Sequence, residues 1–135
     1  MALLQTGLIV IGKPDSEHVS INITDRNPDG WLSGTLDICS GPFSGRCPAS
    51  FIKGELRKFA GEVQRLYQDL AGTATLSPME NYIDMKLTGN GRGQVTAEGT
   101  ARDSFVDGIH LAFRVDFDQT DLPGIIAALR SADPA

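Results

Sequence analysis

Apolar and polar residues alternate along most of the chain, which is the pattern of β-strands with one buried and one solvent-exposed face. In HLAFRVDF, residues 110–117, every second residue from Leu111 to Phe117 is large and apolar. We therefore expect about four strands within residues 6–52 and three within residues 80–117. The same alternation recurs in three further stretches: HVSINIT at 18–24, WLSGTLDI at 31–38 and NYIDMKL at 81–87.

A different period separates these two groups of strands and predicts one long helix over about residues 54–71. Apolar residues there recur at steps of three and four, while charged residues occupy the opposite side. Gly54 is suited to the N-cap, and Gly72 stands where a helix commonly ends on a left-handed glycine. The apolar side of this helix consists of Leu56, Phe59, Val63, Leu66, Tyr67 and Leu70.

A second, shorter helix is predicted over about residues 121–131, where TDLPGIIAALR offers Thr120 as the N-cap and Pro123 in the first turn. Runs of strands interrupted by one helix indicate an α+β fold with an antiparallel sheet rather than alternating βαβ units. We expect a single domain over residues 1–135, in which one curved sheet of about seven strands packs on the long helix. The last few residues are expected to form a loose tail.

The glycine-rich stretch LTGNGRGQVT, residues 87–96, could expose backbone amides to a phosphate or could simply turn one strand into the next. A phosphate loop of the dinucleotide type must lead into a helix, because the helix N-terminus supplies the dipole and further N–H groups. Here an alternating strand follows instead. Asn90-Gly91 is also a favoured pair for a two-residue hairpin turn, so we interpret the stretch as a β-hairpin.

The charge of the chain restricts its partners. Among 135 residues, 17 are acidic and 12 are basic, which gives a formal net charge of −5. Such a chain repels nucleic acid and anionic lipid and favours a basic partner. The apolar run Leu8 to Ile11 is far shorter than a membrane span requires, and we expect no signal peptide before it. We therefore expect a cytoplasmic protein that binds neither nucleic acid nor membrane.

Reactive side chains are few and form no known catalytic pattern. Cys39 and Cys47 lack the spacing of a zinc or redox motif, and we expect both to be reduced thiols. His18 and His110 stand next to no nucleophile, and Asp116-x-Asp118 lacks the further oxygen ligands of a calcium loop. The sequence therefore predicts no catalytic residue, no metal site and no cofactor.

Acidic residues crowd one C-terminal stretch and are the candidate partner-binding residues. A negative patch can steer a basic protein and raise its association rate, although such clusters are also common on solvated edges. Trp31 and Tyr82 are placed by parity on the open face of the sheet, where an aromatic side chain can anchor a partner. Trp31 could equally pack beneath a neighbouring loop. The candidate acids are Asp103, Asp107, Asp116 and Asp118.

From Trp31 onward, the chain carries a recognisable series of segments. They are GWLSGTLDI, GPFSG, FIKGELRKFAGEVQRLYQDLAGTATLSPMENYIDMKL, GRGQVTAEGTA and HLAFRVDFDQTDLPGIIAAL. In these segments the chain is similar to the WapI-type immunity proteins of bacterial polymorphic-toxin systems, which tend to show an F-x-x-x-L-x-x-L-Y-x-x-L-x-G helix end, a glycine-led strand and D-Q-T-x-L before a last helix. The resemblance implies a protein that binds and neutralises a cognate toxin without catalysis or cofactor. It does not extend to the first thirty residues.

Two other classes of function remain as alternatives. A curved sheet wrapped on a helix can leave an apolar pocket between them, so a small-molecule-binding protein is the second hypothesis. An enzyme ranks third, because the chain offers no paired base and nucleophile. The toxin's identity and the oligomeric state stay open at this point.

Overall fold

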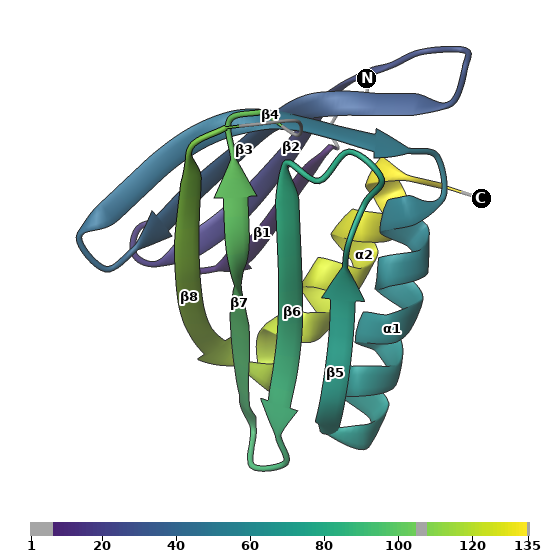
Figure 1. Ribbon diagram of the computed structural model, residues 1–135. Helices are drawn as coiled ribbons and strands as arrows, with labels where there is room; N and C mark the ends of the chain where they lie inside the picture. The colour runs from purple at the N-terminus through teal and green to yellow at the C-terminus, as the bar shows by residue number, and fades with distance from the viewer. Residues whose placement is uncertain (1–6, 105–107, 135) are drawn as a thin grey trace.

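The computed structural model describes residues 7–104 and 108–134, and within them the chain forms eight strands, two α-helices and one 3₁₀ turn. Figure 1 shows their arrangement. The strands of the first half are β1 (Leu8–Gly12), β2 (His18–Arg26), β3 (Trp31–Ser40) and β4 (Phe43–Ile52). The rest of the chain forms α1 (Glu55–Asp69), β5 (Ala71–Leu76), β6 (Ile83–Asn90), β7 (Gln94–Arg102), β8 (His110–Asp118), the 3₁₀ turn η1 (Gln119–Asp121) and α2 (Leu122–Ala132).

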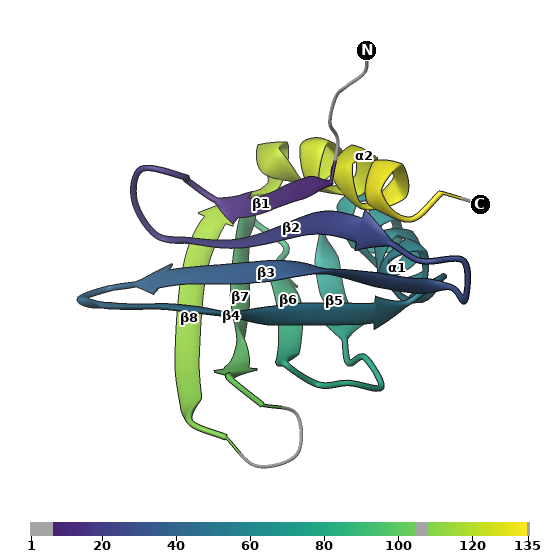
Figure 2. The same cartoon turned by 90° about the horizontal axis from the view of Figure 1, so that it is seen from above.

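The strands form two antiparallel sheets of four, in the orders β1-β2-β3-β4 and β5-β6-β7-β8. The α+β class, the long helix and the short C-terminal helix are therefore confirmed, but the single sheet of about seven strands is wrong. Figures 1 and 2 show the first sheet lying across the ends of the strands of the second. Strand β5, which follows α1, pairs with β6 and with no strand before the helix. The strands after α1 therefore form a separate sheet.

Strand β5 is absent from the sequence-based prediction because its pattern is weak. Its sequence AGTATL places only Ala74 and Leu76 in the interior, and its other four residues are small or hydroxylic and exposed. Two buried positions are too few to show a period of two. The strand is held instead by α1, which packs along it.

The core lies between the inner faces of the two sheets and the two helices, and its buried apolar side chains form one cluster. Helix α1 packs against α2 and β5, while α2 also covers β1. Tyr67 and Leu70 were expected on the buried side of α1, but each is 39% exposed. They belong to the last turn of the helix, beyond its last buried residue, Leu66. The largest fully buried side chains include Phe51, Phe59, Ile9, Ile11, Ile21, Leu36, Leu56, Ile83, Met85 and Leu87.

The helix ends differ in part from expectation. Gly54 is the N-cap of α1, as predicted, with a left-handed φ of 100°. The left-handed C-cap is Leu70, with φ 59°, and not Gly72, which has already entered β5. Thr120 does not cap α2 either, because η1 precedes the helix and Asp118 accepts the Thr120 N–H at 2.9 Å. Pro123 does lie in the first turn of α2.

The glycine-rich stretch is a hairpin, as predicted, but its turn is longer than the expected Asn90-Gly91 pair. Strand β6 ends at Asn90 and β7 begins at Gln94, so the loop is Gly91-Arg92-Gly93, with positive φ at both glycines. The Asn90 Oδ1 accepts the N–H groups of Arg92 (2.7 Å) and Gln94 (3.1 Å). The Gly91 N–H donates to the Leu70 carbonyl at 2.9 Å, so these amides already have protein acceptors.

Candidate partner-binding surfaces

The candidate acids are close in sequence but separate in space. Asp118 pairs with Gln94 at one end of the β7–β8 hairpin, whereas Arg102 pairs with His110 at the other end, immediately before Asp103. An extended strand rises about 3.3 Å per residue, so Asp103 and Asp118 lie about 25 Å apart. Asp116 lies on the same face of β8 as Asp118. Asp107 lies outside the described residues.

Asp103 closes the connection between β7 and β8. Its Oδ1 accepts the Ile109 N–H at 2.8 Å, and its own N–H donates to the Ile109 carbonyl at 3.3 Å. The side chain remains exposed and forms no ion pair with any residue in the described ranges. Asp103 therefore holds Ile109 in place and still presents negative charge to the solvent.

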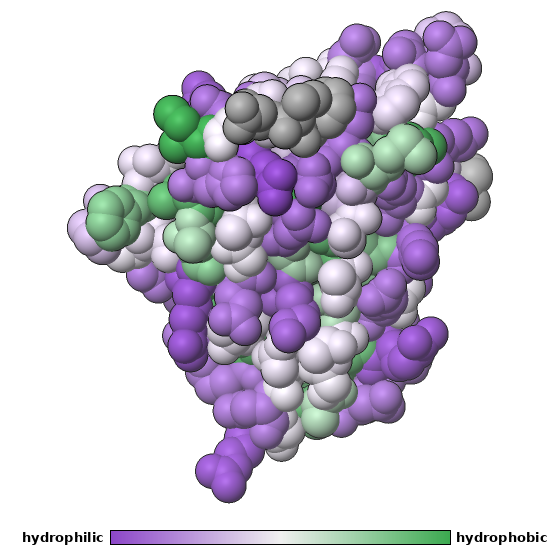
Figure 3. All heavy atoms as spheres, viewed as in Figure 1, coloured by the Kyte–Doolittle hydropathy of each residue, from purple (hydrophilic) through white to green (hydrophobic). Residues whose placement is uncertain are grey.

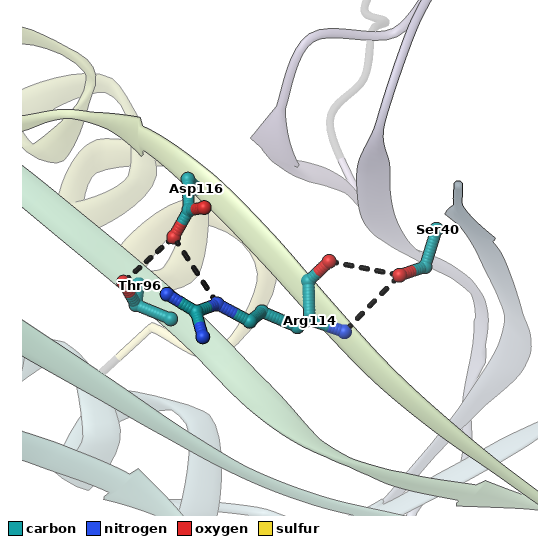
Figure 4. Close-up of polar contacts among 4 residues, drawn as sticks. All are labelled: Ser40, Thr96, Arg114 and Asp116. Carbon is teal, nitrogen blue, oxygen red and sulfur yellow. Dashed lines mark hydrogen bonds and ion pairs between the residues drawn. The ribbon is translucent and has the colours of Figure 1, made fainter.

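Asp116 and Asp118 each accept a hydrogen bond from a residue at the same end of the second sheet. The Thr96 hydroxyl donates to Asp116 Oδ1 at 2.7 Å, and the Arg114 Nε lies 3.6 Å from the same oxygen (Figure 4). The hydrogen bond from the Thr120 backbone N–H is the main cause that lowers the pKa of the Asp118 carboxyl below its ordinary value. Both side chains are exposed.

The outer face of the second sheet is of mixed charge and not a uniform acidic surface. Cross-strand pairing aligns Lys86 with Glu98 and Glu98 with Arg114, so one row alternates in sign across three strands. Opposite charges placed side by side largely cancel at a distance. This row therefore does not add to the acids at the two ends of the hairpin, Asp103 at one end and Asp116 and Asp118 at the other.

The two candidate aromatic residues belong to different sheets. Trp31 begins β3, is half-buried, and pairs with Ile52 of β4. Its backbone N–H donates to Asn27 Oδ1 at 3.0 Å. Tyr82 precedes β6 in the second sheet and packs against the core. The single open face that the sequence predicted for Trp31 and Tyr82 is thus divided between two sheets.

Exposed apolar side chains gather at a corner that the sequence analysis missed. We define the β4–β8 corner by Phe43, Ile109 and Leu111. Phe43 is 64% exposed and Ile109 is 80% exposed, while Leu111 is half-buried. Green, apolar side chains collect at the upper left of the molecular face in Figure 3, where β4 and β8 meet.

The two hairpins are joined at this corner by direct contacts. The Ser40 hydroxyl donates to the Arg114 carbonyl at 2.8 Å and accepts the Arg114 N–H at 3.1 Å (Figure 4). A Cβ added to Gly45 would lie 3.5 Å from Leu111 Cδ2, so the Leu111 side chain of β8 lies against the backbone of β4. The β4–β8 corner is therefore a fixed surface.

The start of α1 is the opposite case, because its first backbone N–H groups are bound by an acceptor from a distant part of the chain. We define the α1-start junction by Gly54, Glu55, Arg57 and Asp133. Asp133 is only 1% exposed, and its Oδ2 accepts the N–H groups of Gly54 (2.7 Å) and Arg57 (3.2 Å). Asp133 is therefore docked on the helix, and the Pro134 carbonyl accepts a hydrogen bond from Arg57 at 2.8 Å, so these two residues are not part of the loose tail that was expected. A carboxylate at this position also complements the positive end of the helix dipole.

Glu55 completes the junction. Its two carboxylate oxygens accept the N–H of Ile52 (2.6 Å) and the N–H of Met79 (2.9 Å), which ties β4 and the β5–β6 connection to the helix. The hollow between α1 and β5, of about 230 Å³, is lined by Glu55, Lys58 and Glu62 among others. Three charged side chains around so small a space do not favour an apolar ligand.

The two thiols stand on opposite faces of the first sheet. Cys39 follows the outward parity of β3, opposite His18 and Ser44, whereas Cys47 pairs with the buried Leu36 and points inward. Side chains on opposite faces cannot form a disulfide without moving the backbone. Burial raises the pKa of the Cys47 thiol, and the negative charges of Asp103 and Asp37 raise it further. In the described part of the chain, no group of three or more His, Cys, Asp and Glu side chains could hold a metal ion.

A comparison with protein families matches residues 10–132 to the WapI-like family of immunity proteins. The chain belongs to the WapI-like immunity protein family. Comparison with curated proteins and with solved structures gave no match. Across residues 7–104 and 108–134, no helix is both long and apolar enough to cross a membrane.

The sequence features that this WapI-like protein shares with its family are structural. In the long-helix feature, Phe59 and Leu66 are buried. In the D-Q-T-x-L feature, Asp118 accepts the Thr120 N–H and Leu122 is buried. These residues form the core and the helix ends, so sharing them indicates a shared fold.

Proposed function

We propose that this WapI-like protein binds and neutralises a cognate toxin, without catalysis, inside the bacterial cell that makes the toxin. The observation that carries the proposal is the family match, which covers residues 10–132 of the 135-residue chain. Immunity by direct binding requires a folded, rigid surface and no reactive group. The fixed corner between the two sheets is consistent with that requirement.

The toxin is proposed to be basic where it meets the protein. The net charge of −5 favours such a partner over long distances, and exposed acids at both ends of the β7–β8 hairpin extend the field along that edge. Rim charges act mainly on the association rate and are screened by salt. Asp103, Asp107, Asp116 and Asp118 are accordingly proposed as steering residues. Trp31 and Tyr82 are proposed as contacts of lesser weight.

The first test is protection. The protein is co-expressed with the product of the toxin gene immediately upstream, and cell survival is measured together with binding of the purified pair. Survival and a stable complex are expected. Cells that die, with no complex between the purified proteins, would remove the immunity function for this chain.

The second test isolates charge without disturbing the fold. Asn can keep the oxygen that accepts each hydrogen bond described above, so the variant Asp103→Asn, Asp107→Asn, Asp116→Asn, Asp118→Asn removes charge alone. Association at low salt is expected to slow by roughly tenfold or more, with little change at high salt. The matched control neutralises four other exposed acids, Asp15, Asp25, Asp29 and Asp69, and should slow association much less. Equal slowing by both variants would show that only net charge matters and would reject these four steering residues.

A further inference from the structure

The β4–β8 corner combines exposed apolar area with rigidity. Monomeric proteins expose single apolar residues freely, but side chains gathered on a fixed surface are characteristic of interaction sites. Phe43 stands at the start of β4 and Ile109 immediately before β8, and the two Ser40–Arg114 hydrogen bonds hold these segments together. The Asp103 carboxylate fixes the Ile109 backbone at 2.8 Å. Little conformational entropy would therefore be lost when a partner docks here.

The charge around the corner indicates the kind of partner. Asp37 is paired with Arg46 at 2.7 Å, whereas Asp103 forms no ion pair within the described residues and stays exposed. The negative charges of Asp103 and Asp37 reach Cys47, on the inner side of β4, where they raise the pKa of its thiol. The corner is thus an apolar surface flanked by the exposed carboxylate of Asp103.

We propose that the β4–β8 corner is the apolar centre of the toxin interface, receiving an apolar side chain of the toxin that basic residues flank. This inference rests on the proposed function. Interfaces derive most of their affinity from a few well-packed apolar or aromatic residues surrounded by a charged rim, and Phe43 with Ile109 beside Asp103 has that composition. A second copy of this chain fits the corner poorly. A twofold contact there would place the Asp103 side chains of both copies near each other, in molecules that each carry a net charge of −5.

The experiment uses single substitutions in the full chain, Phe43→Ser and Ile109→Ser, with Met79→Ser as the matched control. Met79 is 72% exposed and lies in the β5–β6 connection at the α1-start junction. Binding to the purified upstream toxin is measured by surface kinetics, and each variant is checked by thermal unfolding. Both corner variants should keep the melting temperature of the wild type. Each should weaken toxin binding roughly 30-fold or more, mainly through faster dissociation. Met79→Ser should bind as the wild type does.

The outcomes separate this inference from the function on which it rests. If the wild type neither binds nor protects, both are overturned. If the wild type binds and the corner variants bind equally well with unchanged melting temperature, only the corner is overturned. Should a corner variant unfold, the milder Phe43→Leu and Ile109→Val retain the fold, and an unchanged affinity for both would equally reject the corner. Loss of a wild-type dimer in gel filtration on Phe43→Ser, with toxin binding intact, would assign the corner to self-association instead.

Discussion

The α1-start junction and the β4–β8 corner are both places where distant segments meet, yet they are built in opposite ways. At the junction, the buried Asp133 and the carboxylate of Glu55 accept backbone N–H groups from three segments of the chain. At the corner, the backbone is joined just as firmly, but Phe43 and Ile109 keep most of their surface in water. The junction uses its polar groups for hydrogen bonds within the fold, whereas the corner leaves its apolar side chains available to a partner.

The difference teaches where to look for a binding surface among the described residues. A group that is already satisfied within the fold stabilises the fold, and changing it should alter stability more than affinity. An apolar side chain that is held in place but exposed to solvent adds little to stability, and changing it should alter affinity more than stability. Each region therefore predicts its own kind of mutant, and three further substitutions test the division.

The largest effect is expected from Phe59→Ala, one turn into α1. Phe59 is 1% exposed, and large-to-small substitutions of such residues typically cost about 3–5 kcal/mol through lost burial and the remaining cavity. Tyr67→Ala on the exposed side of the same helix is the control and should cost less than about 1 kcal/mol. Urea unfolding measures both. Similar small losses of stability for both variants would mean that α1 does not bury its apolar side in the core.

A smaller effect is expected from Asp133→Ala, which removes the acceptor for two N–H groups at the start of α1. Loss of a buried charged acceptor costs about 1–3 kcal/mol. Asp133→Asn, which keeps an acceptor oxygen, should lose less, and Asp29→Asn on an exposed turn should change little. Toxin affinity below the melting transition should stay the same for all three. A variant at Asp133 that keeps its stability but loses toxin binding would reverse the assignment of the two regions.

The smallest effect sharpens the electrostatics of the corner. Because its pKa is raised, Cys47 ionises less than an ordinary thiol at a given pH, so in a Cys39→Ser background it should react slowly with iodoacetamide at pH 8. Asp103→Asn removes one of the negative charges that raise this pKa and should therefore speed the reaction. Asp15→Asn should not. An identical rate with and without the Asp103 charge would show that its field does not extend to β4.

Local patterns were sufficient for the parts of this fold that depend on one segment alone. The alternation in HLAFRVDF corresponds to β8, and the three-four spacing around Phe59 corresponds to α1. Each segment alone shows which of its faces is buried. The division into two sheets depends on which strands meet across α1, and no single segment records it. Strand β5 has too few apolar residues to reveal itself.

The candidate site was harder to predict for the same reason. The acids looked like one cluster because they are close in sequence, but an extended strand carries neighbours in sequence far apart in space. Phe43 and Ile109 each stand beside a turn, where no period marks them as exposed. They become one surface only because Ser40 and Arg114, which are 74 residues apart in sequence, join the two hairpins.

The contact of Asp133 with α1 also determines when the start of this helix can be completed during synthesis of the chain. The carboxylate that completes the first turn of α1 lies 79 residues after Gly54 and 76 after Arg57. At a translation rate of about 5–20 residues per second, the ribosome delivers this cap about 4–16 s after the residues it binds. Until then, the first amides of α1 are left to water. The helix that forms one wall of the core is thus finished only after residue 133 has left the ribosome, and ribosome-bound chains that stop before residue 133 should show faster amide exchange at Gly54 and Arg57 than longer ones.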